Sequence, residues 1–203
     1  MLFVWYKVSF DEKWSHGSAV CETVYFFVEF VCVFPWKCVS LNNQNREKIM
    51  DGILRKLPIG IQTFEDIRRK NYLYVDKTAL VWRMANMGKP YFLSRPRRFG
   101  KSLLLSTFES YFLGKKELFE GLAIEKMETE WKEYPVLHID LNAEKYDKPE
   151  KLNEILSNHL TQWELKYGKG IDERTLSSRF GGVIRRACEQ TGQQVVVLVD
   201  AYD

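Results

Sequence analysis

Gly100, Lys101 and Ser102 follow one another in the sequence, shortly after three arginines. A glycine, a lysine and a hydroxyl in this order are typical of a P-loop, in which consecutive backbone N–H groups surround phosphates at the positive end of a helix. Gly100 lets the backbone come close to the phosphates, Lys101 reaches the β- and γ-phosphates, and Ser102 coordinates Mg²⁺. The three residues therefore predict a site for a nucleoside triphosphate such as ATP, bound together with Mg²⁺.

The opening of this loop departs from the usual pattern. The full motif GxxxxGK[ST] has its first glycine where this sequence has Arg95. A basic opening keeps the phosphate nest around Gly100 and changes only the entry turn. We expect the nucleotide to contact the loop and the start of the next helix, at Arg97, Arg98, Phe99, Gly100, Lys101, Ser102 and Leu103.

The neighbouring segments make this signal more specific, because Gly-Lys-Ser alone occurs by chance in many proteins. Tyr91 to Ser94 reads as a short strand before the loop. Ser102 to Leu113 reads as a helix with one apolar face, and Gly114 is suited to its C-terminal cap. A strand, a loop and a helix in this order are the context that a P-loop requires.

A second part of the site is predicted near the end of the chain. The apolar run from Val195 to Val199 is typical of a strand buried on both faces of a parallel sheet, and it ends in Asp200. P-loop enzymes hold magnesium with an acid in this place, so Ser102 and Asp200 are the predicted metal ligands. Hydrolysing proteins of this layout commonly have a glutamate next, whereas Ala201 cannot accept a proton. Asp203 is a poorly placed substitute base, so we expect weak or absent hydrolysis.

Basic residues in the loop leave a second interpretation open. Arg95, Arg97, Arg98 and Lys101 lie within seven residues, which also suits contact with a nucleic-acid backbone. A triphosphate needs a positive loop as well. The net charge of +3 is too small to indicate a nucleic-acid or membrane partner by itself. The histidines at positions 138 and 159 are interpreted as structural.

Length and composition indicate one soluble domain, since the chain has 203 residues, of which 45% are hydrophobic and 28% charged. The apolar run at residues 23–34 is too short to span a membrane and contains Glu29. Cys21, Cys32 and Cys38 with His16 match no zinc pattern. Cysteines without a pairing pattern suit the reducing cytoplasm, so we expect a cytoplasmic protein with no membrane segment.

Strands and helices alternate after Gly88, which predicts an α/β fold with a parallel sheet flanked by helices. The further elements are a strand at Tyr72–Val75, a helix ending near Gly88, a strand at Val136–Leu141, a helix from Pro149 to Gly168 and a helix from Asp172. Residues 1–49 have no sustained period and are expected to be an extension of unknown role outside the domain. Residues 50–203 form the predicted domain.

Several stretches together resemble the bacterial AAA-ATPase-like domain family. They are LPIGIQTFEDIR, YLYVDKTALV, YFLSRPRRFGKSLLLSTFESYF, LFEGLAI, YPVLHIDLN and VVVLVDAYD, and they cover Leu57 to Asp203. The resemblance implies a P-loop NTPase-like fold, in which Arg95 is a family trait because the family's loop reads RPRRFGKS. Relatives usually read VDEYDKP at the second motif, so Ala201 is a departure from the family. Many relatives continue into a nuclease-like domain of the PD-(D/E)XK kind.

The resemblance also implies that the sheet is incomplete at its C-terminal side. In P-loop ATPases with an inserted strand, the strand after the second motif lies between the P-loop strand and the strand of that motif. A chain that stops at Asp203 lacks this strand, and exposed strand edges favour aggregation. We therefore expect a truncated family member of marginal stability, and a non-functional fragment stays open beside nucleotide binding.

Overall fold

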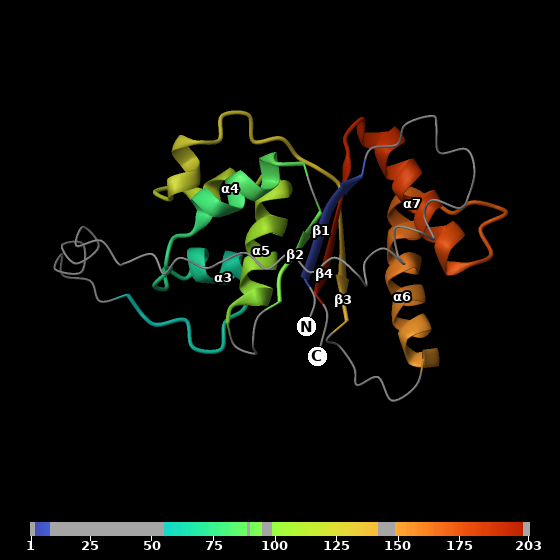
Figure 1. The fold of residues 1–203 in the computed structure, drawn as a ribbon, viewed down its shortest axis with the longest axis horizontal. Helices are drawn as coiled ribbons and strands as arrows, with labels where there is room; N and C mark the ends of the chain where they lie inside the picture. The colour runs from blue at the N-terminus through green and yellow to red at the C-terminus, as the bar shows by residue number, and fades with distance from the viewer. Residues whose placement is uncertain (1–2, 9–54, 89, 95–98, 142–148, 201–203) are drawn as a thin grey trace.

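The computed structural model describes residues 3–8, 55–88, 90–94, 99–141 and 149–200, and for residues 3–8 it describes the backbone. The sheet is built of β1 (Phe3–Val8), β2 (Tyr91–Phe92), β3 (Val136–Asp140) and β4 (Val195–Asp200). The helices are α3 (Phe64–Arg69), α4 (Thr78–Asn86), α5 (Lys101–Phe112), α6 (Pro149–Tyr167) and α7 (Leu176–Thr191), with the 3-10 helices η2 (Lys116–Phe119) and η3 (Ala123–Lys126). Figure 1 shows three layers, with α3, α4 and α5 on one side of the sheet and α6 and α7 on the other.

The strands lie in the order β2-β1-β4-β3. β3 and β4 are parallel, which confirms the expected parallel pairing at these two strands. β1 runs antiparallel to both of its neighbours, so the sheet as a whole is mixed rather than parallel. The segment in front of residue 50 thus supplies a strand to the interior of the sheet. The division of the chain at residue 50 stays a prediction, while six residues from the first part pair with strands of the second.

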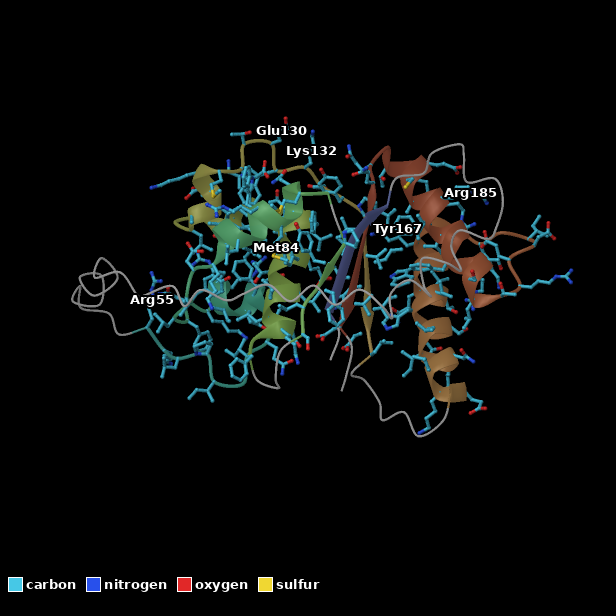
Figure 2. The ribbon with its side chains drawn as sticks, in the orientation of Figure 1. Arg55, Met84, Glu130, Lys132, Tyr167 and Arg185 are labelled. Carbon is cyan, nitrogen blue, oxygen red and sulfur yellow. The ribbon has the colours of Figure 1, made fainter. Side chains whose placement is uncertain are left out.

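Both faces of β4 are covered, as its β-branched composition predicts. Val196 and Leu198 pack in the core with α3, α4 and α5. Val195 packs with Leu137 of β3 in the core with α6 and α7. Side chains on successive residues of a strand point to opposite faces, so an uninterrupted apolar run is what a strand between two helix layers needs. Figure 2 shows side chains filling the space on both sides of the sheet, with Tyr167 between the sheet and its helices.

Helix α5 has the predicted extent within one residue at each end and buries Leu105, Phe108 and Phe112. Gly114 ends it with a φ of 68°, in the left-handed region that glycine favours. The N–H of Gly114 donates to the carbonyl of Tyr111 at 3.0 Å, and that of Lys115 donates to Ser110 at 3.1 Å. These two bonds form a Schellman motif and satisfy carbonyls at the helix end.

The strand expected at Tyr72–Val75 is absent from the described structure. The N–H of Tyr72 donates to the carbonyl of Ile67 at 2.9 Å and that of Leu73 donates to Lys56 at 2.9 Å. The first of these bonds ends helix α3, and Tyr74 then packs edge-on against Phe64 with ring centroids 5.1 Å apart. Tertiary contacts therefore decide the conformation of this segment against its β propensity.

Helix α7 begins four residues later than the expected start at Asp172. Thr175 is its N-cap, because its hydroxyl accepts a hydrogen bond from the N–H of Ser178 at 3.1 Å and the Ser178 hydroxyl interacts with the backbone of Thr175. This reciprocal pair is a capping box. Glu173 is engaged elsewhere, since its carboxylate pairs with Arg186.

Candidate functional site

The carboxyl ends of β3 and β4 and the first turn of α5 lie at one edge of the molecule (Figure 1). Asp140 and Asp200 are the last residues of their strands and are directly opposite each other in the register. The N–H of Leu141 donates to the carbonyl of Asp200 at 2.8 Å and closes the ladder at this edge. In open α/β sheets, ligands bind outside the carboxyl ends of the strands. The edge is therefore the natural place for a binding site in this fold.

The first turn of α5 is arranged to receive an anion. Gly100 is its N-cap with a φ of 73°, and no heavy atom lies within 4 Å of the place where a Cβ would be. Gly100 has no side chain that could cap this helix end, and the first intrahelical bond runs from the N–H of Leu104 to the carbonyl of Gly100 at 3.0 Å. The N-terminal N–H groups and the helix dipole, about half a positive charge, therefore point toward the loop before the helix.

Lys101 and Asp200 are charged residues with almost no exposed surface. Lys101 is 5% exposed at the start of α5, and Asp200 is 7% exposed at the end of β4. Asp200 has the same strand parity as Val196 and Leu198, which face the layer of α5. The sheet thus directs the carboxylate of Asp200 to the side of the sheet on which Lys101 lies.

His138 of β3, two residues before the strand-ending Asp140, contacts Glu109 of α5. Nδ1 of His138 in β3 is 3.1 Å from Oε2 of Glu109 in α5, and its Nε2 is buried with no hydrogen-bond partner among the residues described. Burial lowers the pKa of His138, but the hydrogen bond and charge of Glu109, with the charges of Asp140 and Asp200, outweigh burial and raise the pKa above its usual value. His138 is thus close enough to both strand-end carboxylates to sense their charge. His159 lies on the other side, stacked on Trp163.

The structure describes part of the predicted site. Lys101 and half-buried Ser102 begin α5 and Asp200 ends β4, and Phe99 before the helix is 62% exposed. Gly100 and Leu103 belong to the same turn. Three loop arginines and two residues of the chain end lie outside the described residues, namely Arg95, Arg97, Arg98, Ala201 and Asp203. The predictions for them stay predictions.

The donor set at this edge fits a hard cation. A serine hydroxyl and a carboxylate supply oxygen ligands, and Mg²⁺ usually takes one or two protein oxygens and completes its shell with phosphates and water. Within the described ranges, no group of three or more His, Cys, Asp or Glu side chains lies together so that it could hold a metal ion. The zinc alternative at His16, Cys21, Cys32 and Cys38 falls outside those ranges.

Sequence reasoning did not single out Asp140 and Glu109, and it assigned His138 a structural role only. One signal was available, because Asp140 and Asp200 each close an apolar strand, and parallel strands end at the same edge. Nothing in the sequence places Glu109 of α5 against His138, since that contact depends on how the helix packs on the sheet.

No helix in the described part of the chain is long and apolar enough to cross a bilayer.

Comparison with known proteins gives a match to one family model and one protein. The family model described as "Predicted AAA-ATPase" matches residues 58–203. A protein of Azotobacter chroococcum mcd 1, described as an uncharacterized protein in the vnfD 5′ region, is 43% identical over 150 residues. The match covers 73% of this chain and 29% of the relative, so the chain spans less than a third of that protein's length. No solved structure matches the chain.

Proposed function

The chain belongs to the predicted AAA-ATPase family, and on that premise we propose that it binds ATP with Mg²⁺ at the edge formed by α5 and β4. One observation carries this proposal. Lys101 is buried in the first turn of α5 on the side of the sheet to which β4 directs the buried Asp200. The two charges stand on rigid elements at the carboxyl edge of the sheet, where ligands of α/β proteins bind.

The first turn of α5 is the phosphate-binding part of the proposed site. Its N–H groups donate to phosphate oxygens, and the left-handed Gly100 lets the backbone approach them. Lys101 adds a full positive charge. Because this lysine is shielded from water, its attraction to phosphate is stronger than that of a surface lysine at the same distance.

Asp200 and Ser102 are the proposed protein ligands of the metal. When bound, Mg²⁺ neutralises charge on the phosphates and holds them in a fixed orientation. The neighbouring Asp140 adds a second negative charge to the edge, which favours a cation there. Asp200 is nearly inaccessible to water, so its orientation is set by β4 rather than by solvent.

Hydrolysis is proposed to be weak. The residue after Asp200 is Ala201, which offers no proton acceptor to an attacking water. Positioning and charge neutralisation supply only part of the acceleration that phosphoryl transfer needs. We therefore expect phosphate release by this chain to stay close to the background rate even when the nucleotide site is saturated.

Thermal unfolding with and without Mg-ATP tests nucleotide binding. At about 100 times the dissociation constant, a ligand stabilises the folded state by about 2.7 kcal/mol, which raises Tm by several degrees. We expect this shift for the wild type and for Lys116→Ala, a control at an exposed lysine beyond α5, and no shift for Lys101→Ala. A wild type that does not shift, or a Lys101→Ala variant that shifts equally, contradicts the proposal.

The same assay with EDTA tests the metal. ATP should raise Tm of the wild type much less in EDTA than in Mg²⁺. Asp200→Asn removes one charged ligand, so the gain on adding Mg²⁺ should largely disappear while a shift with ATP alone persists. An Asp200→Asn variant with the full Mg²⁺-dependent gain would show that the metal is held elsewhere.

A further inference from the structure

β1 lies in the middle of the sheet, although it is far from its neighbours in the sequence. All of its residues pair with β4, from Phe3 opposite Asp200 to Val8 opposite Val195. On its other side, Val4 and Trp5 pair with the two residues of β2. β2 joins the sheet through β1, as the strand order β2-β1-β4-β3 shows. Figure 1 shows β1 running between β2 and β4 in the opposite direction to both.

The space that β1 fills is one strand wide. β2 and β4 are both antiparallel to β1, so they are parallel to each other. Neighbouring strands lie about 4.8 Å apart, which places β2 and β4 roughly 10 Å from each other. Each of them presents backbone N–H and C=O groups to this space. Because such groups are costly to bury without partners, the space requires an extended segment that pairs on both sides.

The direction and the origin of β1 distinguish it from the other strands. A strand joined to its parallel neighbour by a helical crossover runs in the same direction as that neighbour, as β3 and β4 do. β1 runs the other way and lies outside residues 58–203, which match the family model. Residues 9–54 separate it from the part of the domain that follows. β1 is thus added to the sheet in the manner of a peptide that binds by β-augmentation.

We propose that the space between β2 and β4 is an acceptor slot for an extended segment, that residues 3–8 of this chain are its occupant, and that this occupant can also bind as a separate peptide. The slot is inferred from strand pairing and does not depend on nucleotide binding. The effect of the slot on nucleotide binding rests on the function proposed above.

Occupancy of the slot couples residues 3–8 to the nucleotide site. The strand before the P-loop, β2, and the strand that carries Asp200, β4, touch β1 from opposite sides. With the slot filled, the carboxyl end of β2 and Asp200 at the end of β4 are held at a fixed separation. With the slot empty, only a fraction of molecules has this geometry, and the apparent dissociation constant rises in inverse proportion to that fraction.

The first test weakens β1 in the full chain. Proline in a central strand removes a ladder hydrogen bond, so Tyr6→Pro should expel β1. A fluorescein-labelled peptide of residues 1–13 should then bind the variant, measured by fluorescence anisotropy, and restore a cooperative melting transition. The same peptide with proline at position 6 is the matched control and should do neither. The proposal is overturned if Tyr6→Pro neither binds the peptide nor is refolded by it, or if it melts like the wild type.

A second test fixes β1 in place and does not depend on a weakened variant. The register puts Tyr6 opposite Val197, so the pair Tyr6→Cys with Val197→Cys should form a disulfide on mild oxidation, identified by peptide mapping. The control pair Tyr6→Cys with Val195→Cys is two residues out of register and should cross-link much less. Equal cross-linking of the two pairs, or none in the first, contradicts the occupancy of the slot by residues 3–8.

Mg-ATP separates this proposal from the one on which it rests. If both proposals hold, Tyr6→Pro weakens Mg-ATP binding about tenfold or more and the added peptide restores it. If the wild type binds no nucleotide but the peptide still binds Tyr6→Pro, the slot stands and the proposed function fails. If Tyr6→Pro binds Mg-ATP as tightly as the wild type without peptide, the coupling is wrong although nucleotide binding is right.

Discussion

The two helix layers that cover the sheet are stabilised in different ways. The layer of α3, α4 and α5 has an aromatic core made of Phe64, Phe108, Tyr111, Phe112 and Phe119, with Trp131 and Tyr134 packed against it. The layer of α6 and α7 has a smaller core of Leu137, Leu160, Tyr167, Val183, Ile184, Ala187 and Val195. That second layer adds ion pairs between nearly buried side chains.

Ring contacts run through the first layer from α3 to the segment before β3. Phe64 and Phe119 have centroids 4.9 Å apart, and Phe112 and Tyr134 meet edge to face at 5.7 Å. Such pairs contribute about 0.5–1.5 kcal/mol each beyond the burial of their area. α5 is thereby fixed by large rigid side chains on the layer that carries Lys101, which suits a helix whose first turn is the proposed phosphate-binding part.

Two arginine–glutamate pairs join α7 to neighbouring segments in the second layer. Arg179 donates from Nε and Nη2 to the two carboxylate oxygens of Glu164 in α6, at 2.6 and 2.9 Å. Arg186 donates from Nη1 and Nη2 to the two carboxylate oxygens of Glu173. The layer of α3, α4 and α5 is thus stabilised mainly by the packing of large side chains, whereas the layer of α6 and α7 depends in part on ion pairs. Substitutions and pH should therefore affect the two layers differently.

The largest effect is expected from emptying the aromatic core. Phe108→Ala should lower the free energy of unfolding by about 3–5 kcal/mol, because the removed ring leaves a cavity that its rigid neighbours do not fill. Urea denaturation measures this. Val183→Ala in the other core is the comparison, and its cost should be clearly smaller, since less buried volume is lost. Equal costs would remove the distinction between the two cores.

Breaking an ion pair of the second layer comes next. Glu164→Gln should cost about 2 kcal/mol, since Arg179 keeps its charge in a place with little access to water. Glu154→Gln on the same helix changes an exposed residue and should cost less than about 0.5 kcal/mol. Similar values for the two variants would show that the Arg179 pair contributes no more than a surface charge.

Lowering the pH should weaken the same ion pair without any substitution. The hydrogen bond from Arg179 lowers the pKa of Glu164 below its ordinary value of 4.5, although desolvation opposes this. A lowered carboxyl pKa gives stability that is present above the unfolded pKa and lost as the pH falls through the folded one. Below pH 4.5 the wild type should therefore lose more stability than Glu164→Gln. Glu65 and Glu128 in the first layer also have a lowered pKa, so the difference between wild type and variant is the quantity to compare.

Raising the pH should lower the stability of the first layer through His138. Its pKa is raised above 6.5 in the folded state, so its contribution is present below that pH and is lost as the pH rises through the folded pKa. His138→Gln should abolish this loss in urea titrations carried out from pH 6 to 9. A variant that keeps the wild-type slope over this range would assign the slope to another group.

The smallest effect is expected from a surface pair of the first layer. Nζ of Lys115 lies 2.6 Å from Oε2 of Glu65, and the two side chains are 33% and 30% exposed. Lys115→Ala should cost about 0.5 kcal/mol, and 0.5 M salt should reduce this cost because exposed charges are screened. A cost as large as that of Glu164→Gln would mean that charge matters equally in both layers.

The sequence by itself determined the elements whose signals are local. Glycine at the end of α5, the apolar face of that helix and the apolar run of β4 each depend on a few neighbouring residues, and the structure has them close to the predicted positions. The order Gly100-Lys101-Ser102 and the strand-ending Asp200 are signals of the same kind. Such local signals can be recognised in the sequence because backbone geometry and burial on two faces restrict the residue types at these positions.

Only the tertiary structure decided which distant segments meet. β1 comes from the part of the chain predicted to lie outside the domain, yet it pairs along the whole of β4. Gly182 stands inside α7, where glycine lowers helix stability, and a Cβ there would lie 1.7 Å from Oε1 of Glu173. The contact of His138 with Glu109 joins a strand to a helix. Strand neighbours and helix packing arise from burial summed over the whole chain, which no short window of sequence contains.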